Sequence, residues 1–162
     1  MIEPFEIETA MKIGFSGTRK GMTSQQKQVM ECLLSKLPKI TFAHHGDCIG
    51  ADAEFHQACL NIHIAIVIHP PSDNKNRANC IGFAEEMPPA PYLERDRRIV
   101  DSTELLIATP AGKEHLRSGT WTTIRYARKR KKPVIIIEPD GSLACERSTW
   151  EELEIDKYDL GT

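Results

Sequence analysis

The stretch Ile13–Met30, IGFSGTRKGMTSQQKQVM, runs from an apolar strand through a turn of small residues into a helix. Met11–Phe15 is a short apolar run of the kind found in buried strands. Thr23 or Ser24 then offers a side-chain oxygen as the N-cap of a helix, whose apolar positions recur at helical spacing. This strand–turn–helix unit is typical of α/β proteins.

The same alternation continues along the chain. Strands are expected at Ile40–Ala43, Ile62–Ile68, Glu104–Thr109 and Pro133–Glu138, and helices at Ala51–Leu60, Tyr92–Asp101 and Thr120–Lys131. Because the strands are apolar throughout, they predict a doubly wound α/β fold, with a mostly parallel sheet of about five or more strands and helices on both faces. We expect a single domain over residues 1–162, with its core at about 11–140 and a polar C-terminal tail at 141–162.

The composition is that of an ordinary globular protein, with 40% hydrophobic and 27% charged residues. A net charge of -2 provides no overall positive field for nucleic acid or for a membrane surface. No apolar run reaches the roughly 18 residues of a transmembrane helix, and the acidic start MIEPFEIETAMK lacks the features of a signal peptide. We therefore expect a cytoplasmic protein without a membrane partner, and nucleic acid is the less favoured partner.

The five cysteines predict neither disulfides nor a metal centre. Their number is odd and no CxxC pair occurs, which disfavours a disulfide framework and a zinc site. Cys48 lies in a glycine turn where a reactive thiolate is conceivable, but no motif places a histidine or asparagine to activate it. The segment His69–Pro91 is rich in Pro, Asn and Asp and lacks periodicity, and a loop of this length is usually functional or mobile.

Three glycine-containing turns follow strands and open helices, so they should meet at the carboxyl edge of the sheet, where such folds bind ligands. The first consists of Ser16, Gly17, Thr18 and Arg19. Its hydroxyls, its arginine and the positive end of the following helix suit an anion such as phosphate. A tight turn with a solvated arginine is the alternative.

The second turn contains Gly46, Asp47, Gly50 and Asp52. Asp47 could accept a hydrogen bond from a ribose hydroxyl, whereas Asp52 could simply stabilise the helix dipole. The third turn contains Ser118, Gly119 and Thr120 at another helix start, followed by Trp121. Trp121 is expected to pack in the core, with base stacking as the alternative.

Two clusters of basic residues remain. Tyr92–Arg98 packs three arginines into four residues, either as a phosphate clamp or as an exposed helix with Glu–Arg pairs. Arg125–Lys132 is a basic helix end, expected to be a solvated face with weak nucleic-acid or partner binding as the minor alternative.

The order of these motifs resembles the SLOG superfamily, which includes DNA-processing protein A, the LOG-type phosphoribohydrolases and the small YpsA-related proteins of bacteria and phages. The resemblance rests on Gly17-Thr18-Arg19, Gly46-x-x-x-Gly50-Ala51-Asp52 with His56, Arg95-Asp96-Arg97 and Ser118-Gly119-Thr120, and covers about residues 11–140. It implies a Rossmann-like fold and a nucleotide-type ligand, with all three turns holding phosphate or ribose. It also implies a homo-oligomer, since members commonly self-associate.

One departure from the family pattern bears on catalysis. LOG-type enzymes carry a Pro-Gly-Gly-x-Gly-Thr-x-x-Glu signature whose glutamate takes part in hydrolysis, and here Thr123 stands at the glutamate position. The leading hypothesis is therefore a nucleotide-binding sensor, carrier or sequestering protein. A nucleotide N-glycosidase of the LOG-like type is the first alternative, with Asp47, Glu94, Arg95 and Arg98 as catalytic candidates. A single-stranded DNA-binding module is the second alternative. Magnesium is the one cofactor considered, held through a phosphate of the ligand.

Overall fold

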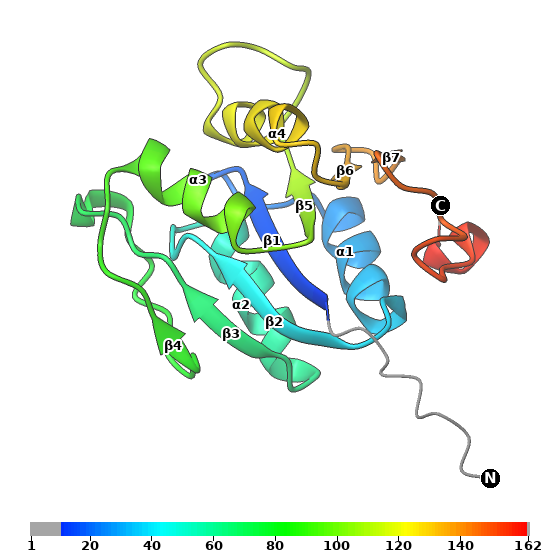
Figure 1. Ribbon diagram of the computed structural model, residues 1–162, viewed down its shortest axis with the longest axis horizontal. Coiled ribbons are helices and arrows are strands. Elements are labelled where there is room, and N and C mark those ends of the chain that lie inside the picture. Colours follow the sequence, from blue (N-terminus) through cyan, green and yellow to red (C-terminus); the bar gives the residue numbers. More distant parts are fainter. Residues whose placement is uncertain (1–10, 162) are drawn as a thin grey trace, which may run out of the picture.

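Seven strands form one sheet within residues 11–161, the part of the chain that the computed structural model describes (Figure 1). The strands are β1 (Met11–Gly17), β2 (Ile40–His45), β3 (Ala65–Ile68), β4 (Glu85–Glu86), β5 (Leu105–Thr109), β6 (Val134–Ile137) and β7 (Leu143–Glu146). Their order is β4-β3-β2-β1-β5-β6-β7, and every pair is parallel except β6 with β7. The mostly parallel sheet is confirmed. The N-terminal stretch used to judge a signal peptide lies mostly outside the described residues.

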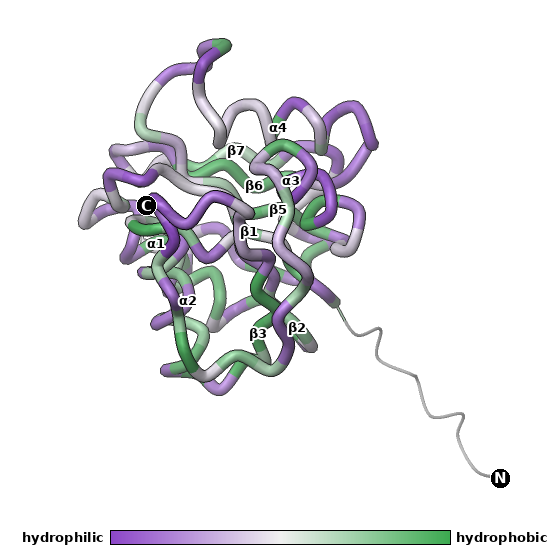
Figure 2. The backbone as a smooth tube through the Cα atoms, turned by 90° about the vertical axis from the view of Figure 1, so that its left-hand side faces the viewer, coloured by the Kyte–Doolittle hydropathy of each residue, from purple (hydrophilic) through white to green (hydrophobic). Residues whose placement is uncertain are grey.

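Helices cover both faces of the sheet, as a doubly wound fold requires. They are α1 (Ser24–Lys36), α2 (Ala51–Asn61), α3 (Tyr92–Asp101) and α4 (Gly119–Lys129), with short 3-10 turns η1 (Asn74–Asn76) and η2 (Lys157–Leu160). In β5, Leu105 and Ile107 pack with α1 and α2, whereas Leu106 and Ala108 pack with α3 and α4. Figure 2 shows the hydrophobic strands between the more hydrophilic helices. None of the described helices is long and apolar enough to cross a membrane.

The chain reverses direction across the sheet at β1. From β1 it passes through α1 and α2 to β2 and β3, and it then returns through α3 to β5 on the other side of β1. The loops after β1 and β5 therefore diverge to opposite faces of the sheet and leave a crevice at the carboxyl edge. This crevice is where the three glycine turns were expected to meet.

The start of α1 ties the first strand–turn–helix unit to the far half of the sheet. Thr23 is the N-cap and forms a capping box with Gln26. The buried Gln26 amide donates to the carbonyls of Pro110 (2.8 Å) and Ile137 (2.9 Å), which follow or end β5 and β6. A single polar side chain thus satisfies two carbonyls that would otherwise be buried without partners.

Two expectations from the sequence were wrong. The strand expected at Ile62–Ile68 begins only at Ala65, because Ile62 and His63 (φ 60°) end α2 and the Ile64 amide bonds back to Cys59. The C-terminal segment is not a loose polar tail. Its strand β7 extends the sheet, and its apolar side chains Leu153, Ile155 and Leu160 are buried in the core with α1.

The segment 69–91 is also more ordered than its composition indicated. It contains η1 and the edge strand β4, and isolated bridges join Cys48 to Arg77 and Pro71 to Ala90. Arg77 pairs with Glu86 within the segment. The segment therefore packs against β3 and against the second glycine turn.

We predict that Gln26→Leu lowers the free energy of unfolding by about 2 kcal/mol or more, because it leaves the buried carbonyls of Pro110 and Ile137 without a donor. Urea denaturation measures the change. The exposed neighbour Gln28→Leu is the matched control and should unfold like the wild type. Equal stability of the two variants would contradict this account of α1.

Candidate ligand-binding site

A cavity of about 410 Å³ opens at the carboxyl edge of the sheet, in the crevice beside β1 and β5. We call it the switch-point pocket. Its walls come from all three glycine turns, from α3 and from the loop before α4. Of the ligand-binding residues expected from the sequence, it brings together Ser16, Gly17, Thr18, Arg19, Gly46, Asp52, Arg95, Ser118, Gly119 and Thr120.

The first turn is held close to α2. A Cβ atom on Gly17 would collide with Ala51 and with the Thr109 hydroxyl, so only glycine permits this approach. The Thr18 carbonyl accepts from the Ala51 amide at 3.0 Å. Arg19 extends from this turn with its guanidinium 4.8 Å from the centre of the Tyr92 ring. Arg19 is exposed to solvent, and its contact with the Tyr92 ring positions it over the pocket.

The third turn presents the N-terminus of α4 to the pocket. Ser118 is the N-cap and accepts from the Trp121 amide at 3.2 Å. The amides of the first helical turn lack intrahelical acceptors, and they carry the positive end of the helix dipole. Arg117 and His115, from the loop before α4, also line the pocket. This side of the pocket suits an anion.

Arg95 lies beneath the pocket, and all three of its guanidinium nitrogens already donate hydrogen bonds within the protein. Its Nε donates to Asp96 at 2.7 Å, its Nη1 to the carbonyls of Gly46 and His69, and its Nη2 to the Cys48 sulfur at 3.6 Å. Its side chain is 6% exposed. The structure therefore contradicts the phosphate-clamp hypothesis for this arginine, which instead fastens α3 to the second turn.

Two carboxylates share this single buried guanidinium. Asp52 accepts from the Cys48 amide at 3.2 Å, and burial raises the pKa of Asp52 to about 7 against the opposing charge of Arg95. Burial also raises the pKa of Asp96, again opposed by Arg95. A Cβ atom on Gly46 would strike both Arg95 and Asp52, so the second turn must carry glycine there. The floor of the pocket is accordingly acidic, whereas its rim is basic.

Asp47 does not reach the pocket. Its carboxylate is fully buried and accepts from Arg77 Nε (2.9 Å) and the Cys80 amide (2.9 Å). It anchors the segment 69–91 and is not free to accept from a ribose or to act in catalysis. Gly50 does not line the pocket either. At φ 85° its Cα faces the carbonyls of Thr18 and Arg19, and it joins the first two turns.

The other two catalytic candidates also lie outside the pocket. Glu94 and Arg98 pair with each other at 2.6 Å across one turn of α3, and both are substantially exposed. This matches the alternative of an exposed helix with Glu–Arg pairs. In contrast, the sequence analysis did not assign Lys20, Tyr92, Asp96, His115 and Arg117 to the site, although they line it. All except His115 lie next to or within a motif that was singled out, and only the folded chain shows which neighbours face inward.

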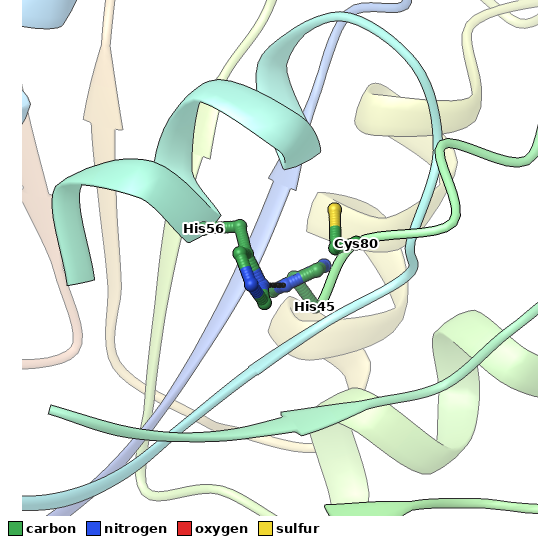
Figure 3. A group of neighbouring side chains, drawn as sticks. All are labelled: His45, His56 and Cys80. Atoms are coloured by element: carbon green, nitrogen blue, oxygen red, sulfur yellow. Dashed lines mark hydrogen bonds between the residues drawn. The ribbon is translucent and has the colours of Figure 1, made fainter. Parts of the chain in front are cut away.

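The described residues contain one group of three possible metal ligands, His45, His56 and Cys80 (Figure 3). His45 Nδ1 accepts from the Asp47 amide at 3.0 Å, so its proton is on Nε2, which donates to His56 Nδ1 at 2.8 Å. His56 Nε2 then donates to the Ile81 carbonyl at 2.6 Å. The hydrogen bonds of this chain thus use the ring protons of both histidines. A metal bound at His45 Nε2 would move the ring proton to Nδ1 and so break the hydrogen bond from the Asp47 amide. We therefore interpret the group as a link between β2, α2 and the segment 69–91.

The three arginines at the basic end of α4 form ion pairs, whereas no ion pair to Lys129, Lys131 or Lys132 is found among residues 11–161. Arg125 and Arg128 both bind Glu114, Arg128 also binds Glu146, and Arg130 binds Asp101. Trp121 is buried in the core, as expected, and its indole donates to the Gly112 carbonyl at 3.0 Å.

Several solved structures share this arrangement of strands and helices. A molybdenum cofactor binding protein from the phototrophic bacterium Rippkaea orientalis superposes with a TM-score of 0.63 at 19% identity, over 81% of this chain and 78% of that one. The molybdenum cofactor carrier protein from Chlamydomonas reinhardtii gives 0.55 at 19% identity, over 79% and 76%. DNA processing protein A from Helicobacter pylori gives 0.56 at 16% identity, over 79% and 65%.

The chain shares the fold of these proteins. No protein-family model matches the sequence, and no relative was found among curated proteins. At these identities the likeness establishes the fold alone. In this fold the pocket described above lies at the point where the strand order of the sheet reverses.

We predict that ionisation of Asp52 lowers the stability of the fold as the pH rises from about 4 to about 7. The folded state holds the Asp52 proton up to about pH 7, whereas the unfolded chain releases it near the ordinary pKa of 3.8. Asp52→Asn removes this contribution and keeps an acceptor for the Cys48 amide. The difference in unfolding free energy, variant minus wild type, should therefore increase over this range and stay constant at higher pH.

Urea denaturation at a series of pH values measures this difference directly. Subtracting the wild type cancels the contribution of the buried histidines, which both proteins share. A difference that does not change between pH 4 and pH 7 would show that burial does not perturb Asp52.

Proposed function

We propose that this protein binds a nucleotide-type small molecule through its phosphate in the switch-point pocket and holds it without reaction, as a sensor, carrier or sequestering protein. The observation that carries the proposal is the basic rim. Arg19, Lys20 and Arg117 surround a cavity into which the N-terminus of α4 opens. A volume of about 410 Å³ is within the range of small-molecule sites.

The polarity of the pocket favours one orientation of such a ligand. A phosphate would lie between the first turn and the start of α4, where amides, hydroxyls and arginine side chains are available. Asp52 and Asp96 repel a phosphate but accept from hydroxyl or amino groups, so the sugar or base would lie toward the floor. A magnesium ion would be held through the phosphate, since both carboxylates are already engaged within the protein.

The similar structures support a small-molecule ligand at the coarse level, because two of them are described as binding or carrying the molybdenum cofactor. The third is described by its single-stranded DNA binding mode, so the expectation that nucleic acid is an unlikely partner has no support from this comparison. The ion pairs of Arg125, Arg128 and Arg130 nevertheless reduce the charge available for a long phosphate backbone.

An N-glycosidase is the second candidate, and the position of Asp96 favours it. Thr123, which replaces the signature glutamate, donates its hydroxyl to the Gly119 carbonyl at 3.0 Å and lines the same cavity between α3 and α4 as Asp96. A carboxylate from α3 thus occupies the neighbourhood of the missing one. A raised pKa would suit a group that protonates the departing base while water attacks the sugar carbon and the C–N bond breaks.

We predict that AMP stabilises the protein against thermal unfolding and that adenosine does not, because the phosphate supplies the binding contacts. Saturation at a hundred times the dissociation constant should contribute about 2.7 kcal/mol. Arg19→Ala should lose most of the shift, whereas Lys27→Ala, which removes a charge from the exposed side of α1, should keep it.

Chromatography of the same samples separates the two candidate functions. Intact AMP after incubation supports the binding protein, whereas release of adenine that Asp96→Asn abolishes supports the N-glycosidase. Equal shifts with AMP and adenosine, or a full shift in Arg19→Ala, would contradict phosphate binding at this rim.

A further inference from the structure

A second cavity of about 210 Å³ lies between α3 and α4, and Asp96 lines both it and the switch-point pocket. We call it the α3–α4 groove. Figure 1 shows α3 and α4 as neighbours beside the carboxyl ends of β1 and β5. The two cavities therefore lie next to each other on either side of one side chain.

The groove carries positive charge that the protein does not neutralise. Arg97 and Lys129 line it, both are exposed, and neither makes an ion pair with any residue in the range 11–161. The Arg97 guanidinium lies 5.4 Å from the centre of the Tyr126 ring. The Tyr126 hydroxyl donates to Asp101 at 2.8 Å, which fixes the ring under the guanidinium. Arg97 is thus held in place with its donors free.

We infer that the α3–α4 groove is a second anion subsite and that the ligand has two phosphate-bearing units, as a dinucleotide has. The inference rests on the proposed function, since the first phosphate must lie in the switch-point pocket. Asp96 separates the two basic regions, and its carboxylate suits a hydrogen-bond donor there. A sugar hydroxyl between two phosphates meets this requirement, and the groove is too small for much more than one added unit.

The test compares uridine 5′-monophosphate with the 5′-phosphorylated ribodinucleotide pUpU, whose first ribose keeps a free 2′-hydroxyl between the two phosphates, by isothermal titration calorimetry. The dinucleotide should bind about tenfold more tightly or better, and its affinity should fall more steeply with salt. The double variant Arg97→Ala/Lys129→Ala should lose this gain and keep the affinity for the mononucleotide. Lys27→Ala/Lys36→Ala removes the same charge from α1, on the opposite face, and should keep both affinities.

The outcomes separate this inference from the proposed function. If the mononucleotide and the dinucleotide bind equally, or if the gain survives in the groove variant, the second subsite is overturned and the proposed function stands. If neither binds to the wild type, both are overturned. A pUpUpUpU ligand should bind no more tightly than pUpU, and a further gain in affinity would overturn the inference that the ligand has only two phosphate-bearing units.

Discussion

The buried guanidinium of Arg95 is the group on which the geometry of the pocket depends. It connects α3 with the second glycine turn and with the end of β3, through Asp96, the carbonyls of Gly46 and His69, and the Cys48 sulfur. A buried cation must be fully hydrogen-bonded to be tolerated, so these partners are held at fixed positions. Because α3 carries Tyr92, which in turn positions Arg19, the rim of the pocket depends on the same interaction.

The distribution of charge follows from this arrangement. Arg95, which the sequence predicted to bind the ligand, instead forms hydrogen bonds within the protein. The basic side chains that remain available lie at the rim. Below them, Asp52 and Asp96 compete for one cation, and burial raises the pKa of each. An anionic group is therefore accommodated at the rim and an uncharged donor group on the floor, which makes the site directional.

The sequence predicted the fold well because its central strands are strongly apolar and because side-chain caps mark the starts of two helices, at Thr23 and Ser118. It also predicted which turns meet, since parallel strands bring their carboxyl ends to one edge. It did not predict the roles of Asp47 and Arg95, because a charged residue in a glycine turn or on a helix has the same local pattern whether it faces the ligand or the interior. Their partners, Arg77 for Asp47 and Gly46 for Arg95, are distant in sequence. The burial of Leu160 in the core was not predicted either, because a short polar segment gives no periodic signal of burial.

The most direct test of the central claim is to locate the ligand on the protein by titrating AMP into ¹⁵N-labelled protein and following the backbone amide resonances. The account predicts that the largest changes occur at Gly17, Thr18 and Arg19 and at Gly119 and Thr120, on the two sides of the switch-point pocket. Changes confined to other surfaces, such as the exposed side of α1 or the edge strand β7, would contradict it.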